Sequence, residues 1–114
     1  MDGAARSQRI FVYGPYTHGD VAANVRNAIL AANELRDHGF YPFIPHLSHY
    51  WHTLCPRPYE EWLVMDLEWL RVCHALLRLP GESSGADKEV EWCIAHEMPV
   101  FYEMADLLAV TLEE

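Results

Sequence analysis

The 114-residue sequence has few basic residues and no long apolar run. Eight lysines and arginines stand against seventeen aspartates and glutamates, which gives a formal net charge of −9 at pH 7. This charge repels nucleic acids and anionic membrane surfaces, so we expect neither a nucleic acid polymer nor a membrane among its partners. No apolar stretch reaches the roughly 18 residues that a membrane span requires, and the N-terminus lacks the apolar core of a signal peptide.

Cysteine is also scarce, and its spacing excludes a disulfide framework. The three cysteines form no CxxC pair, and Cys73 and Cys93 lie inside apolar stretches, as buried thiols commonly do. An odd number without paired spacing favours a reducing compartment, so we expect a cytoplasmic protein. Since 51% of the residues are hydrophobic, the chain can bury one core. We therefore expect a single domain over residues 1–114, in which residues 1–8 form a flexible polar arm.

Several common ligand-binding motifs are missing as well. The first glycine-containing loop, GPYTHG at residues 14–19, matches neither the dinucleotide motif GxGxxG nor the P-loop GxxxxGK[ST]. The serine hydrolase motif GxSxG does not occur either. These absences argue against a Rossmann dinucleotide site, a P-loop NTPase and a serine hydrolase, and we expect no cofactor.

Strand-like and helix-like segments alternate along the sequence. Short apolar runs predict strands at residues 9–14, 40–44, 74–79 and 98–102. Helical periodicity predicts helices at residues 21–38, 59–73, 86–96 and 103–111. Residues 45–58, rich in proline and histidine, predict a long loop. This order predicts a doubly wound, flavodoxin-like or Rossmann-like α/β domain with a parallel sheet of four to five strands and helices on both faces. Ligands of such sheets bind beyond the carboxyl ends of the strands.

The segment LPGESSGADKE, residues 79–89, places a turn and a helix start after the third expected strand. The amides of a helix N-terminus attract anions, so Ser83, Ser84 and Gly85 could hold a phosphate. Glu89 lies about one turn into the same helix, over the same crevice. Alternatively, one of the serines only caps the helix, and Asp87 and Glu89 favour its dipole.

A second acidic residue, Asp66, lies in the apolar segment MDLEWL. Helical spacing places it one step from an expected apolar face of Trp62, Met65, Trp69 and Val72. Burial beside apolar neighbours raises the pKa of a carboxyl group. Two carboxylates in different environments can divide nucleophilic and acid–base roles. The alternative is that Asp66 lies with Glu68 and Arg71 on an ordinary solvated helix edge.

The expected long loop contains a regular series of side chains that could bind a ligand. Histidines or cysteine recur at every third position, at His46, His49, His52 and Cys55. Imidazole and thiolate are zinc ligands, but this spacing is not a zinc-finger pattern. Loop histidines more often contact substrate or solvent, so we expect no metal site. Several aromatic residues of the expected loops could stack on a nucleobase, or could simply pack: Tyr13, Tyr16, Tyr50, Trp51 and Tyr59.

The order FVYGPY, FIPHL, MDLEWL, LPGESSGADKE and MPV resembles that of the nucleoside 2-deoxyribosyltransferase superfamily, over about residues 9–102. DLEWL, an apolar strand and then SxGxxE are especially similar to the 2′-deoxynucleoside 5′-monophosphate N-hydrolases. The resemblance implies cleavage of an N-glycosidic bond in a nucleoside or nucleotide. It also implies a homodimer or larger homo-oligomer.

The resemblance assigns roles to individual residues. The family nucleophile is the glutamate four positions after the loop glycine, which is Glu89 here and not Glu91. Asp66 corresponds to the aspartate that positions the sugar or assists proton transfer. Ser83 occupies the place where the hydrolases hold phosphate and the transferases carry an aspartate, which favours a 5′-monophosphate ligand. Ser84 and Gly85 would complete the phosphate site. Four residues would line the base or sugar: Gly14, Pro15, Tyr16 and His46.

The sequence also departs from the family pattern. His74 replaces an acidic residue often found at the start of the third strand, and a tyrosine of the transferases falls near Phe11. The chain is also short at its C-terminus, where transferases supply a residue to a neighbouring subunit. These departures favour a hydrolase over a deoxyribosyltransferase. They also keep open a non-catalytic protein of the same fold that binds a nucleotide or nucleotide sugar.

Overall fold

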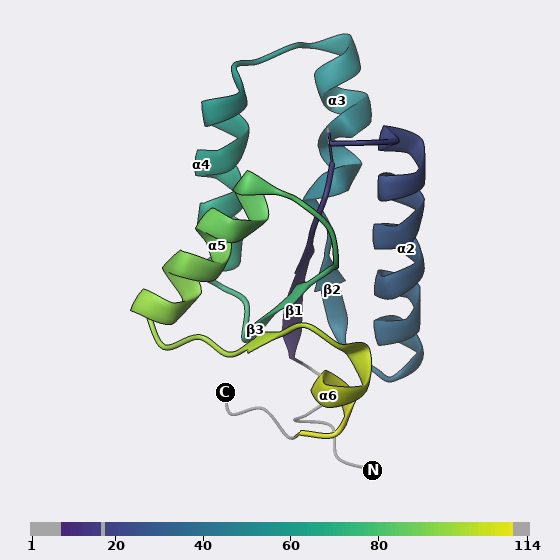
Figure 1. Ribbon diagram of the computed structural model, residues 1–114, viewed down its shortest axis with the longest axis vertical. Helices are drawn as coiled ribbons and strands as arrows, with labels where there is room; N and C mark the ends of the chain where they lie inside the picture. Colours follow the sequence, from purple (N-terminus) through teal and green to yellow (C-terminus); the bar gives the residue numbers. More distant parts are fainter. Residues whose placement is uncertain (1–7, 17, 111–114) are drawn as a thin grey trace.

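A four-stranded parallel sheet forms the centre of the molecule (Figure 1). The structure is a computed structural model that describes residues 8–16 and 18–110. The strands lie in the order β2-β1-β3-β4, and every adjacent pair is parallel. Their bounds are Arg9–Tyr13 for β1, Tyr41–Phe43 for β2, Ala75–Arg78 for β3 and Val100–Phe101 for β4. The predicted α/β class with a parallel sheet is confirmed.

Helices cover both faces of this sheet, also as predicted. On one side lies α2, and on the other lie α4 and α5 (Figure 1). The bounds of the helices are Val21–Asp37 for α2, Pro45–Leu47 for the 3-10 helix η1, Ser48–Leu54 for α3, Tyr59–Leu70 for α4, Ser84–Ala95 for α5 and Met104–Leu108 for α6. In the part of the chain that the structure describes, no helix has both the length and the apolarity needed to cross a membrane.

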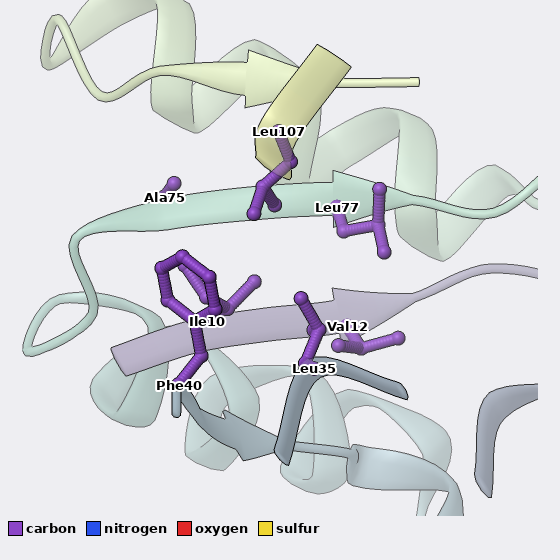
Figure 2. Packing of buried hydrophobic residues seen from close by; sticks show 7 residues of the cluster. All are labelled: Ile10, Val12, Leu35, Phe40, Ala75, Leu77 and Leu107. Carbon is purple, nitrogen blue, oxygen red and sulfur yellow. The ribbon is translucent and has the colours of Figure 1, made fainter. Parts of the chain in front are cut away.

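Each strand sends alternate side chains into two separate cores, because successive residues of a strand point to opposite faces. On the α2 and α6 face, Ile10 and Val12 pack with Leu77, as Figure 2 shows. On the α4 and α5 face, Phe11 packs with Leu76. All five of these side chains are buried. The continuous apolar runs in the sequence therefore correspond to strands covered on both faces.

The expected long loop at residues 45–58 is wrong, because most of it is helical. Pro45 begins η1, where its fixed φ suits a first helical position, and α3 follows directly. Residues 55–58 alone connect α3 to α4. The α3 helix is short and has no fully buried residue, so its sequence carries no apolar periodicity. It is held instead by ring packing, in which Trp51 and Trp62 of α4 lie edge to face with centroids 5.0 Å apart.

The buried face of α4 also differs from the expected one. Asp66 and Leu70 are buried, whereas Trp69 and Val72 are half exposed. The sheet meets α4 through Leu70, which belongs to the core on that face. Trp69 instead stacks on the ring of Phe43 at the edge of the sheet, with centroids 5.4 Å apart. The spacing of the tryptophans therefore predicted a face of α4 that lies beside the core. Asp66 lies on the face of α4 that is turned toward the core.

The ends of the described chain differ in part from the expectation. Residues 1–7 of the expected arm lie outside the described residues, but Gln8 is buried and its carbonyl accepts a hydrogen bond from the Tyr41 amide at 2.9 Å. The expected helix at residues 103–111 is α6, which ends at Leu108, and residue 111 lies outside the described part. The other boundaries shift by a few residues, most clearly at α5, which begins at Ser84.

The loops after β1 and β3 lie against each other at the carboxyl edge of the sheet. A β-carbon on Gly14 would lie 2.6 Å from Cβ of Leu79, and one on Gly81 would lie 2.6 Å from Cγ of Pro15. Gly81 also has a φ of +114°, which L side chains rarely adopt. The strand order reverses between β1 and β3, since the chain passes to β2 on one side and β4 on the other. Parallel α/β sheets bind ligands at this kind of reversal.

Candidate active site

Two buried carboxyl groups lie on the helices that cover one face of the sheet. Asp66 is on α4 and Glu89 is on α5, with exposed fractions of 4% and 1%. The alternative that Asp66 belongs to a solvated edge is therefore wrong. Glu91, two residues beyond Glu89, is exposed, which leaves Glu89 as the carboxyl group that α5 turns inward.

Burial strongly favours the protonated form of both groups. It raises the pKa of Asp66 to about 7. The pKa of Glu89 rises to about 9, chiefly through burial and further through the nearby charge of Asp66. Two like charges in one desolvated region cannot both form cheaply, so the pair titrates as a unit. The doubly ionised form of the pair is therefore disfavoured at neutral pH.

Neither oxygen of the Glu89 carboxyl group has a hydrogen-bond partner among the described residues. Buried polar atoms are nearly always bonded, and leaving one unbonded costs about 1–3 kcal/mol. Such groups concentrate at sites of function rather than in structural cores. Glu89 is, however, not part of the lining of either of the two cavities described below. It lies beneath their surface.

The first cavity, which we call the α5 cavity, has a volume of about 600 Å³ and opens at the N-terminus of α5. It is lined by His18, Tyr13, Tyr16, Tyr59, Glu82, Ser83, Ser84, Gly85 and Asp87. All three residues predicted to hold phosphate are therefore in its wall. Its charged side chains are acidic, and each is paired: Glu82 with His18 at 3.6 Å, and Asp87 with Arg78 at 3.0 Å.

Ser83 caps α5, as one of the two interpretations of the sequence predicted. Its Oγ accepts a hydrogen bond from the Ala86 amide at 3.1 Å. This bond uses a lone pair of the hydroxyl and leaves its O–H able to donate. The amides of Ser84 and Gly85 belong to the first turn, where no intrahelical acceptor exists. Capping and anion binding are therefore compatible at this helix end.

Arg78, at the end of β3, holds the same loop in shape. Its guanidinium donates to the carbonyls of Leu79 and Gly81 as well as to the carboxylate of Asp87. The side chain is only 9% exposed, so these charge-assisted bonds form away from bulk water. Sequence reasoning did not single out Arg78, because an arginine inside an apolar strand carries no motif.

The second cavity, which we call the ring-lined cavity, has a volume of about 400 Å³. It lies between η1, α3 and α4, and half of the residues in its wall carry an aromatic or imidazole ring. Its lining includes Tyr13, Tyr16, His46, His49, His52, Arg57, Tyr59, Trp62 and Asp66. Flat rings around a slot of this size suit a planar heterocycle. The predicted residues Tyr16 and His46 both belong to it.

Three tyrosines, Tyr13, Tyr16 and Tyr59, line both cavities and so form the junction between them. A β-carbon on Gly85 would lie 2.7 Å from the Tyr59 hydroxyl and 3.4 Å from that of Tyr13. Burial, and then the charges of Glu89 and Asp66, raise the pKa of Tyr13 far above its usual range. Tyr13 therefore lies in the electric field of both carboxyl groups, next to the helix end.

Tyr13 supplies a hydroxyl to the site from the end of β1. Phe11, near which the resemblance puts a tyrosine of the transferases, is buried in the core. Tyr13 lies two residues later on the same face of β1 and lines both cavities. Tyr13 and Tyr59 had been noted only as stacking candidates. Their positions in the sequence could have indicated a place in the site, because both lie at element ends near the carboxyl edge of the sheet. Tyr13 ends β1, and Tyr59 begins α4.

The histidines of the expected loop are each engaged by a different neighbour. His46 Nε2 lies 2.9 Å from the Pro15 carbonyl, His49 Nδ1 lies 2.7 Å from the Tyr16 hydroxyl, and His52 Nδ1 accepts from Trp62 Nε1 at 2.8 Å. Within residues 8–16 and 18–110, no three side chains of the metal-ligating types come together.

Gly14 and Pro15 do not line either of these two cavities. Gly14 is buried against Leu79, and Pro15 packs against Gly81. Their contribution is made through the backbone, because the close approach of the two loops needs Gly14 and the Pro15 carbonyl fixes His46. The predicted base or sugar residues therefore divide into two that line the ring-lined cavity and two that support it.

Comparison with known proteins assigns the chain to a family but not to an activity. A domain family of unknown function, DUF7768, matches residues 8–103. The chain belongs to that family. The matched segment of this DUF7768 domain contains Asp66, Glu89 and the full lining of both cavities. No curated protein matches the chain.

Proposed function

We propose that this DUF7768 domain cleaves the N-glycosidic bond of a deoxynucleoside or nucleoside 5′-monophosphate. The observation that carries the proposal is the pair of buried, electrostatically coupled carboxyl groups at the two adjoining cavities, with Asp66 in the wall of the ring-lined cavity and Glu89 fully buried. The two cavities suit the two ends of a nucleotide. The α5 cavity ends at helix amides, which suit a phosphate, and the ring-lined cavity suits a base.

In the proposed complex, the phosphate lies at the N-terminus of α5. The amides of Ser84 and Gly85 and the hydroxyl of Ser83 donate to it, and the helix dipole favours its charge. The base occupies the ring-lined cavity, against the rings of Tyr16 and His46. The sugar then lies at the tyrosine junction, above the two carboxyl groups. A local rearrangement must expose Glu89 to the sugar, since Glu89 lines neither cavity.

The two carboxyl groups take different roles in the proposed reaction. The reactive form has a Glu89 carboxylate and a protonated Asp66. The carboxylate forms a bond to the anomeric carbon while the bond from that carbon to the base nitrogen breaks. The electron pair of that bond goes to the base, which takes the proton from Asp66. Water then displaces Glu89 from the anomeric carbon and returns a proton to Asp66.

The test is release of free base from nucleoside 5′-monophosphates, separated by chromatography. We expect Glu89→Gln to lower the rate by at least about a thousandfold, as loss of a nucleophile does. Glu91→Gln, an exposed change on the same helix, is the matched control and should retain the full rate. A Glu89→Gln protein as fast as the wild type would refute the assignment.

A non-catalytic nucleotide-binding protein is the second candidate. The observation in its favour is that both oxygens of Glu89 are closed off from the cavities in the free protein. This alternative predicts binding of monophosphates in calorimetry with no base released over hours. A nucleoside deoxyribosyltransferase would instead release base and pass the sugar to an added second base. The same chromatography separates all three outcomes.

A further inference from the structure

The outer end of the ring-lined cavity carries hydrogen-bond donors. Arg57 follows α3 and His52 lies in its last turn, whereas His46 precedes the helix. The seven residues of α3 separate these ends by about 10 Å at 1.5 Å per residue. Asp66 is in the C-terminal half of α4. The glycosidic bond, whose base nitrogen takes the proton of Asp66 in the proposed reaction, therefore lies toward the His46 end of the cavity. Arg57 and His52 therefore face the edge of the base that is remote from the sugar.

The tautomer of His52 follows from its partners. The indole N–H of Trp62 and the backbone N–H of Arg57 both point at His52 Nδ1, at 2.8 and 3.3 Å. Both groups can only donate, so Nδ1 must offer a lone pair and the proton resides on Nε2. The remaining ring nitrogen of His52 is therefore a donor, with no acceptor among the described residues.

Arg57 adds further donors at the same end. Its guanidinium has five N–H groups and no acceptor. Nη1 donates to the exposed carboxylate of Glu61 at 3.0 Å. The remaining N–H groups of the guanidinium form no hydrogen bond within the part of the chain that the structure describes. The side chain is half exposed at the rim of the cavity. A ligand that fills the cavity thus meets N–H groups from two residues at its outer edge.

The inner end has the opposite character. The Pro15 carbonyl can only accept, so the proton of His46 resides on Nε2 and Nδ1 is an acceptor. His46 is 1% exposed, and its Nδ1 has no partner among the described residues. The rings of Tyr13 and Tyr16 hold the imidazole edge to face, with centroids 5.2 and 5.9 Å away. The cavity wall therefore differs between its ends, with a buried acceptor on His46 and donors on His52 and Arg57.

We propose that the ring-lined cavity selects bases with a carbonyl oxygen at the edge remote from the sugar, namely 6-oxopurines and 4-oxopyrimidines. An amino group at that edge would place N–H against the N–H groups of His52 and Arg57, and with only the adjacent ring nitrogen able to accept, one of the two donor residues would stay unpaired. The selectivity rests on the proposed function, since it takes the occupant of the cavity to be a nucleobase.

The test compares ligands that differ in one exocyclic group and, with it, in the hydrogen on the adjacent ring nitrogen. Calorimetry on full-length Glu89→Gln protein, which does not turn over, measures the affinities of deoxyinosine and deoxyadenosine monophosphates, and of deoxyuridine and deoxycytidine monophosphates. We expect each oxo ligand to bind at least about tenfold more tightly than its amino partner, as a well-placed pair of hydrogen bonds discriminates between bases. Arg57→Met added to this protein should reduce the ratio several-fold. Arg71→Met, which removes an exposed arginine paired with Glu68, should leave it unchanged.

The outcomes separate this selectivity from the activity itself. Equal or reversed affinities, with base still released by the wild type, would overturn the selectivity and leave the glycosidase intact. A preference that survives Arg57→Met in full would overturn the role of that residue. Oxo-selective binding with no base released would support the selectivity and refute the activity. Failure of every monophosphate to bind would overturn both.

Discussion

Replacing Glu89 with glutamine should stabilise the protein increasingly as the pH rises. Glu89 has a pKa of about 9 in the folded protein against an ordinary value of 4.5. Between these two values the folded protein binds more protons than the unfolded chain, so its stability falls as the pH rises. The contribution of Glu89 to stability is most favourable below pH 4.5, where the group is protonated in both states. Glutamine has the same shape and no charge to lose.

The size of this effect follows from the width of the window. Each pH unit between 4.5 and 9 lowers the stability by about 1.4 kcal/mol. At pH 7.5, three units above the ordinary pKa of Glu89, the wild type has lost about 4 kcal/mol. The variant avoids that loss, which corresponds to a rise in the melting temperature on the order of 10 °C. An unbonded glutamine amide in the buried site costs about 1–3 kcal/mol at every pH. The test is therefore how the difference in unfolding free energy changes with pH, and not its value at any one pH.

The assay is urea unfolding of both proteins from pH 4 to pH 9, followed by circular dichroism. The difference in unfolding free energy should be flat below pH 4.5 and should grow through neutral pH. Glu91→Gln, at an exposed position on the same helix, should run parallel to the wild type. If Glu89→Gln also runs parallel to the wild type, then the carboxyl group of Glu89 is not desolvated and the argument fails.

Three further changes test the loop at the start of α5. Gly85→Ala should weaken monophosphate binding by about tenfold or more, since its β-carbon would lie 2.7 Å from the Tyr59 hydroxyl; unchanged affinity in calorimetry would show that the junction is not used. Ser83→Ala should lower the unfolding free energy by about 1 kcal/mol through loss of the helix cap, and Ser83→Asp, which restores a cap, should recover stability but not phosphate binding. Arg78→Met should cost about 2–4 kcal/mol in urea unfolding because two loop carbonyls lose a buried charged donor; a stability equal to the wild type would mean that the loop holds its shape without it.

The fold class was within reach of the sequence because its signals are local. Apolar runs and helical periods alternate at β1, α2, β3 and α5, and this order admits little besides a parallel sheet covered on both faces. The loops at the strand ends, and the helix start near Ser83, were located for the same reason. The helix α3 was missed, since it buries no apolar stripe and is held by packing against Trp62 of α4.

The candidate site itself is divided between sequence and tertiary structure. The sequence alone selected Asp66 and Glu89 as acidic residues near the strand ends, and the resemblance gave them roles. Only tertiary packing decided that both are buried, that one raises the pKa of the other, and that Tyr13 and Tyr59 join two cavities above them. The physical reason is that solvent exclusion and electrostatic coupling depend on residues brought together from distant segments. Spacing along one helix determines which way a side chain points, but not what lies opposite it.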